Sequence, residues 1–233
     1  MPYRRLPNTD QARIRALKKA IDKEESLNAD NNSVISVKTL NEAQNFLTRF
    51  EQAHNYYVYC YNNQISSSQK YQPSVKTARL YVSHFIQVLN LAVTRSEIKE
   101  EYKAFYGLDP KDYAVPDLAN ESSIIEWGEK IIKGEKERTR KGGAPIYNPT
   151  IAKVTVHYEI FKEGYEQQKH LQWLTSRSLG ALAAMREKAD QIILDIWNQI
   201  EGSFETLPPN HRLNECQNYG VVYYYRTGET KPQ

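Results

Sequence analysis

The ten prolines of this 233-residue chain divide it into spans that can hold helices and spans that cannot. They stand at positions 2, 7, 73, 110, 116, 145, 149, 208, 209 and 232. Proline lacks a backbone donor and clashes with the preceding turn, so helix interiors avoid it. The long proline-free spans are therefore the places where we expect the helices.

The longest predicted helix covers residues 150–202. Asn148 is expected to cap its free N–H groups, and Pro149 to occupy its first position. Residues 151–161 also show strand periodicity, but no turn residue separates them from the helical pattern that follows, which favours helix. A break near 176–180 stays open, because the middle of the expected core face is polar. Toward the end, one apolar face recurs at three- and four-residue intervals: Ala189, Ile192, Ile193, Ile196, Trp197 and Ile200.

Similar patterns predict four further helices, at residues 9–28, 39–68, 74–106 and 121–140. The second begins with a capping box, in which Thr39 and Glu42 each satisfy a backbone donor near the other. Tyr71–Ser74 is interpreted as a tight connection, so the third helix would return antiparallel to the second. The sequence thus predicts an all-α bundle of long antiparallel helices, with residues 1–233 in a single domain.

The carboxy-terminal residues 219–226 have strand composition, with valine and three consecutive tyrosines. A lone strand needs a partner, because unpaired backbone groups promote aggregation. We expect this segment to pair with residues 34–37 or with another subunit. Val221, Tyr223 and Tyr225 would face one side, and Val222, Tyr224 and Arg226 the other.

Composition points to an ordinary globular protein rather than a nucleic-acid or membrane protein. The net charge is only +3, which does not by itself indicate nucleic acid. Two groups of basic residues could contact phosphates without sequence specificity: Arg4, Arg5, Arg13, Arg15, Lys18 and Lys19, and Lys130, Lys133, Lys136, Arg138, Arg140 and Lys141. The sequence shows neither a secretory signal nor an 18-residue apolar run, and its two cysteines form no metal or disulfide pattern, so we expect a cytoplasmic protein.

The sharpest metal-like pattern is Glu51-Gln52-Ala53-His54. Two ligands one turn apart on a bundle helix are typical of ferritin-like carboxylate-bridged metal sites. Glu166 and His170, four residues apart, form a second weak candidate pair. The remaining histidines lack a partner at the right spacing, so ordinary core or boundary histidines are the favoured interpretation, and we expect no cofactor.

Arg79 and His84 offer an enzymatic alternative. Their spacing, which Arg49 and His54 share, resembles the Arg-x4-His motif of helical ribonucleases of the HEPN type, in which arginine and histidine act on the RNA phosphodiester. That resemblance would make Arg79 and His84 catalytic. However, a chain with five histidines is expected to contain about one such spacing by chance, and the polar residue that follows the arginine in that family is Leu80 here.

Seventeen tyrosines are many for this length. Tyrosine suits protein interfaces, because its ring is apolar and its hydroxyl is polar. The favoured function is therefore a non-enzymatic scaffold or protein-interaction bundle, binding a protein partner or itself, and the metal-binding and RNA-acting readings at His54 or His84 are its alternatives. The expected contact residues lie in the tail: Tyr219, Val221, Tyr223, Tyr224 and Tyr225.

Three stretches carry a resemblance over the whole chain. Residues 3–10, 145–154 and 219–226 are similar to stretches of a group of uncharacterised bacterial all-helical proteins. The resemblance implies a helical fold. It brings no catalytic residue, cofactor or activity to this sequence.

Overall fold

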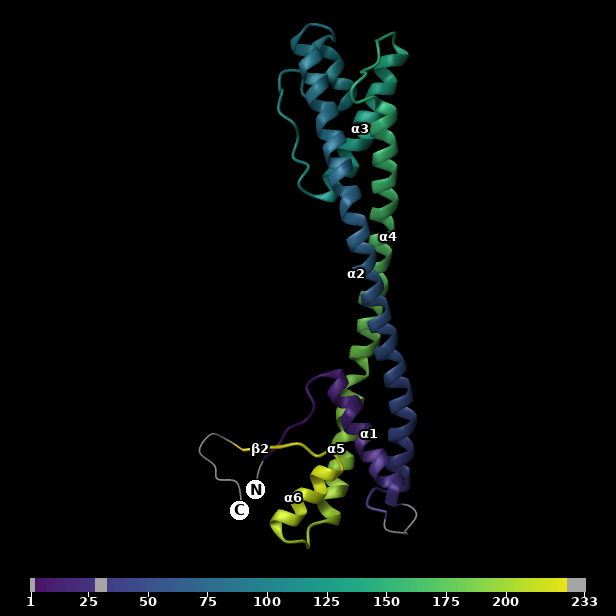
Figure 1. Cartoon of the computed structure of the whole chain (residues 1–233), viewed down its shortest axis with the longest axis vertical. Helices are drawn as coiled ribbons and strands as arrows, with labels where there is room; N and C mark the ends of the chain where they lie inside the picture. The colour runs from purple at the N-terminus through teal and green to yellow at the C-terminus, as the bar shows by residue number, and fades with distance from the viewer. Residues whose placement is uncertain (1–2, 28–32, 226–233) are drawn as a thin grey trace. The chain divides into compact units, whose positions relative to one another are not determined.

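The computed structural model describes residues 3–27 and 33–225, and this part of the chain is 76% helical (Figure 1). The predicted all-α class is therefore confirmed, with long antiparallel helices and one short two-stranded sheet. Within these residues, no helix is long and apolar enough to cross a membrane. The elements are β1 (Tyr3–Arg4), α1 (Asp10–Leu27), α2 (Val37–Thr94), the 3-10 helix η2 (Glu100–Tyr106), α3 (Glu121–Arg140), α4 (Ile151–Ala184), α5 (Arg186–Ser203), α6 (Pro209–Asn218) and β2 (Tyr223–Tyr224).

The chain forms two compact units where a single domain is the sequence expectation. Unit 1 contains residues 1–60 and 175–233, and unit 2 contains residues 61–174. Each unit has its own buried apolar cluster. The division falls inside α2 and α4, so each of these helices supplies side chains to both clusters, a feature that helix periodicity alone does not reveal.

In unit 1, α1 packs against α5 through the apolar faces that their periodicity predicts. Leu17 of α1 and Trp197 of α5 are fully buried in the same cluster. Two bidentate ion pairs join the same helices: the guanidinium of Arg13 donates to both carboxylate oxygens of Asp190 at 2.8 and 2.9 Å, and Arg186 pairs likewise with Asp10. Planar guanidinium–carboxylate pairs fix orientation as well as adding energy.

α2 begins earlier than predicted. Ser36, not Thr39, caps it: the Ser36 hydroxyl accepts from the backbone N–H of Thr39 at 3.3 Å, and Ser36 O accepts from Leu40 N. Glu42 is not part of a capping box, because its carboxylate forms an ion pair with Lys188. The serine is favoured because it precedes a regular turn and presents its oxygen to the free donors.

α2 continues through Pro73, so the prediction of two helices, 39–68 and 74–106, joined by a turn is wrong. Packing in unit 2 explains the continuity. The buried ring of Tyr71 stacks on Phe161 of α4 with centroids 5.9 Å apart, and Val75 is buried in the same cluster. Nearby, the hydroxyl of Ser74 donates to Tyr71 O. Burial of this stripe offsets the hydrogen bond that proline removes.

The end of the predicted 74–106 helix also differs. α2 stops at Thr94, and Ser96 takes a left-handed conformation with φ 62°. The chain then forms η2, which ends at Gly107 with φ 70°, where glycine carries no Cβ penalty. Gly107 is therefore a stop signal, as expected, but for a separate short helix.

α3 covers the predicted range, and the side chain of Asn120 caps it by accepting from Ser123 N at 2.8 Å. Its last turns carry a buried ionic network that periodicity does not reveal. Arg138, 2% exposed, donates to both oxygens of Glu135 at 2.9 Å, and the hydroxyl of Tyr106 donates to the same carboxylate. Buried charges persist when they are paired and hydrogen-bonded, as these are.

The predicted helix 150–202 is two helices, α4 and α5, separated at Met185. The break lies beyond the 176–180 region, because Gly180 is exposed, has open space around it and stays helical. The predicted start also changes. The hydroxyl of Thr150, rather than Asn148, accepts from Lys153 N, and the Asn148–Pro149 bond is cis and lies outside the helix.

The tail pairs with the chain's own beginning. Tyr3 pairs with Tyr224 and Arg4 with Tyr223 in an antiparallel ribbon, so the proposed pairing with residues 34–37 is wrong. Residues 34 and 35 are not available, because both of their backbone N–H groups donate to the buried carboxylate of Glu24. The strand is also shorter than 219–226, and Arg226 lies outside the described residues.

Candidate functional site

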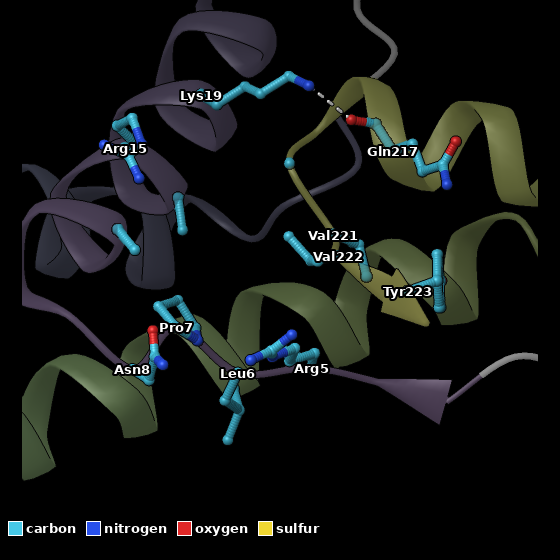
Figure 2. A pocket seen from close by; sticks show the side chains of 13 residues that line it. Arg5, Leu6, Pro7, Asn8, Arg15, Lys19, Gln217, Val221, Val222 and Tyr223 are labelled. Carbon is cyan, nitrogen blue, oxygen red and sulfur yellow. Dashed lines mark hydrogen bonds between the residues drawn. The ribbon is translucent and has the colours of Figure 1, made fainter. Parts of the chain in front are cut away.

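A cleft of about 570 Å³ opens in unit 1 between the first residues of the chain, α1 and the segment that follows α6 (Figure 2). Its volume is within the range of small-ligand pockets. The lining combines apolar residues with three basic ones. The lining residues are Arg5, Leu6, Pro7, Asn8, Ala12, Arg15, Ala16, Lys19, Gln217, Gly220, Val221, Val222 and Tyr223.

One wall is set by the β1–β2 ribbon and by Glu201 of α5. Arg5 N donates to Val222 O at 2.8 Å, which extends the ribbon by one residue pair. Glu201 then holds both strands: its Oε1 accepts from the hydroxyl of Tyr223 at 2.6 Å, and its Oε2 lies 3.6 Å from Arg4 Nη1. Side chains of both strands thereby contact one helix, α5, and the cleft lies beside the ribbon.

The approach of this wall to α1 depends on Gly220, which has φ +95°. A Cβ at Gly220 would lie 3.3 Å from Lys19 Cβ, so the segment approaches α1 closely. This turn directs Val221 into the core, where it is 2% exposed, while Val222 is 48% exposed. Lys19 closes the contact by donating from Nζ to Gln217 O at 2.7 Å.

The charges of the cleft are unbalanced. Among the described residues that line it, three are cations and none is acidic. Lys19 is engaged by Gln217 O, but the guanidinium groups of Arg5 and Arg15 form no ion pair or hydrogen bond with any other part of residues 3–27 and 33–225. Arg13, two residues before Arg15 on the same helix, is by contrast paired with Asp190. The cleft therefore presents two free guanidinium groups above an apolar floor.

The cleft offers poor nucleophiles. Burial, and then the carboxylate of Glu201, raise the pKa of Tyr223 well above its ordinary value, so its hydroxyl keeps its proton. Close by, burial raises the pKa of the fully buried Cys216 thiol. A thiol acts through its thiolate, which this environment disfavours. The arrangement is suited to binding an anion that has an apolar part, rather than to attacking it.

The predicted metal ligands do not converge within the described part of the chain. Glu51 is paired with Lys18 at 2.7 Å, and His54 is half-buried on α2. Glu166 and His170 are both exposed on α4, where His170 stacks on Trp173. No group of three metal-ligating side chains occurs in residues 3–27 and 33–225.

Arg79 and His84 have different surroundings in the structure. Arg79 Nη2 donates to Ala119 O at 2.9 Å, which ties α2 to the loop before α3. His84 is exposed on α2. The residues are five apart on one helix, and neither lines the unit 1 cleft. The second basic group, over 130–141, is largely neutralised within α3 by pairs such as Lys130–Glu126 and Lys133–Glu129.

The tail residues predicted for interaction have mixed positions. Tyr219 is fully buried, and its hydroxyl donates to Glu24 Oε2 at 3.3 Å, so it is a core residue. Val221 and Tyr223 line the cleft. Tyr224 is 41% exposed and packs on Tyr3, while Tyr225 is half-buried.

In the sequence, Arg5, Arg15 and Lys19 are distinguished only as members of a diffuse basic group. The alternation of Val221 and Val222 was a usable signal for an inward- and an outward-facing residue. Nothing in the sequence showed that positions 5–8 and 217–223 share a cleft, because they are separated by about the whole chain.

Comparison with known proteins adds no identification: no family model, curated protein or solved structure matches this chain. The resemblance to bacterial helical proteins stays a prediction. Two of the stretches that carry it, residues 3–10 and 219–225, lie side by side in unit 1 and form walls of the cleft.

Two smaller cavities lie in unit 2. One, of about 480 Å³, is a polar groove between α2 and α4 that includes Ser66, Ser67 and Gly164. The other, of about 430 Å³, lies at the start of α3 and includes both Arg79 and Glu121. Each is polar and shows no excess of one charge comparable with the unit 1 cleft, so the cleft is the stronger candidate.

Proposed function

We propose that this chain is a non-enzymatic interaction protein that binds an acidic segment of a protein partner in the unit 1 cleft. The observation that supports this best is the pair of unmatched guanidinium groups, Arg5 and Arg15, on an apolar floor with no acidic lining residue among those described. Complementary charge steers association and excludes wrong partners. The apolar floor supplies the burial that holds the partner.

The walls of the cleft are held in place by contacts within unit 1, which suits binding better than catalysis. Glu201 contacts Arg4 of β1 and Tyr223 of β2, and Gly220 packs directly on α1. A preformed site costs less ordering free energy when a partner docks. The raised pKa values of Tyr223 and Cys216 also argue for recognition over nucleophilic chemistry.

A direct test measures the affinity of a fluorescent peptide of alternating glutamate and leucine by anisotropy. We expect saturable binding that weakens as salt is raised, because exposed charges are screened. A lysine–leucine peptide of equal length should not bind.

A matched pair of variants locates the site. Arg15→Glu should reduce affinity at least about tenfold, equivalent to about 1.4 kcal/mol. Arg49→Glu changes net charge equally, at an exposed arginine of α2 in the same unit that does not line the cleft. Equal losses in the two variants, or no binding of the acidic peptide, would contradict the proposal.

A further inference from the structure

We infer that Arg5 and Arg15 determine specificity because each binds one carboxylate of the partner. The preferred partner segment then carries one acidic side chain on each side of an apolar one. This inference rests on the proposed function and names the chemical groups of the partner that the cleft recognises. It separates recognition of carboxylate geometry from simple attraction of negative charge.

The described arginines of unit 1 differ in their partners. Arg13 and Arg186 each donate from Nε and Nη2 to both oxygens of an aspartate, at 2.8–2.9 Å. Arg15 lies on the same helix as Arg13, and within residues 3–27 and 33–225 neither Arg15 nor Arg5 is paired with a carboxylate. The two arginines at the contact between α1 and α5 thus have carboxylate partners among the described residues, whereas the two arginines that line the cleft have none and can accept one from a bound partner.

Arg5 and Arg15 come from different elements around the cleft. Arg15 projects from α1, and Arg5 comes from the extended segment after β1, on a different wall of the cleft (Figure 2). The lining also includes apolar residues, among them Ala16 at 8% exposure and Val221 at 2%. A segment with an apolar residue flanked by two acidic ones would offer one carboxylate to each arginine and its apolar side chain to this part of the lining.

Lys19 is the third cation of the lining. Its ammonium already donates to Gln217 O, at the end of α6. A lysine ammonium is a point charge with no fixed fork, whereas guanidinium matches a carboxylate in two hydrogen bonds. The two residues available for recognition are therefore both of the type that distinguishes carboxylate geometry.

The experiment compares Arg→Lys with Arg→Ala at positions 5 and 15 in the full chain, using peptides with the patterns Glu-Leu-Glu and Glu-Glu-Leu of equal composition. We expect Arg15→Lys and Arg5→Lys to lose about tenfold in affinity for Glu-Leu-Glu, nearly as much as the alanine variants, because the bidentate contact is lost. Glu-Glu-Leu should bind less tightly to the unaltered protein. Arg49→Lys is the matched control and should bind as the unaltered protein does.

Two results would overturn the inference while leaving the proposed function intact. One is full affinity in both lysine variants, which would show that the cleft recognises only the charge of the peptide. The other is equal affinity for the two peptide orders. Absence of binding to either peptide would overturn the proposed function as well, so the two failures are distinguishable. Circular dichroism of each variant confirms that the fold is retained.

Discussion

The hydroxyl of Tyr223 donates a 2.6 Å hydrogen bond to the carboxylate of Glu201, which also lies 3.6 Å from the guanidinium of Arg4. One side chain of α5 therefore holds both strands of the ribbon. Because the strands contain only two residues each, their own backbone bonds are few. Glu201 is accordingly the residue on which we expect the cleft wall to depend.

Glu201→Ala should destabilise unit 1 by about 1–2 kcal/mol, since a hydrogen bond to a charged group and an ion pair are lost together. Hydrogen exchange at the amides of Arg5 and Tyr224 should accelerate. Tyr223→Phe removes one of the same contacts, so the double variant should lose less than the sum of the single variants. Strict additivity would show that the two residues act independently, and Glu205→Ala, at an exposed position, is the control.

Pro73→Ala should stabilise the protein by about 1–3 kcal/mol in urea unfolding. Alanine restores the N–H that a continuous α2 directs toward the carbonyl of Gln69 and relieves the clash of the ring. Pro209→Ala is the matched control, because Pro209 occupies the start of α6, where no intrahelical donor is lost. A loss of stability in Pro73→Ala would favour a turn at this position.

Arg138→Met should destabilise unit 2 by about 3–5 kcal/mol, because it leaves the carboxylate of Glu135 buried without its ion pair. Adding Glu135→Leu should recover part of the loss by removing the stranded charge. Arg140→Met is the control: Arg140 is 77% exposed and its pair with Glu137 spans 3.7 Å. That change should stay within about 0.5 kcal/mol. Equal effects at 138 and 140 would contradict the network.

Stability should fall as pH rises above 10. Burial raises the pKa of Tyr158 from 10.0 to about 12, and its hydroxyl donates to Ile125 O. Between pH 10 and 12 the unfolded chain releases this proton while the folded chain retains it, so the free energy of unfolding decreases as pH rises.

Tyr158→Phe should therefore cost about 1 kcal/mol at pH 8, where the hydrogen bond is lost, and progressively less toward pH 11. Urea unfolding at several pH values measures the difference. Tyr147→Phe, at a residue 77% exposed, is the control and should show a constant difference. A cost for Tyr158→Phe that does not change with pH would contradict the assignment.

The sequence by itself determined the class of fold and the positions of some helices. Apolar spacing located α1, α3 and the buried face of α5 because a helix in water must cover one stripe, and that requirement is written locally at three- and four-residue intervals. The same reasoning failed at Pro73, where a local stop signal is overridden by the stacking of Tyr71 on Phe161, a contact between residues 90 positions apart.

The tertiary structure alone decided the partner of the tail and the location of the cleft. The composition of 219–226 indicated a strand, but its pairing depended on Glu24 having taken the backbone donors of Val34 and Ile35. Arg5 and Arg15 became candidate recognition residues only because, among the residues that the structure describes, folding brings a carboxylate to Arg13 and none to them. Local sequence fixes what a segment tends to form, whereas the pairing of charges and backbone groups depends on which distant segments arrive beside it.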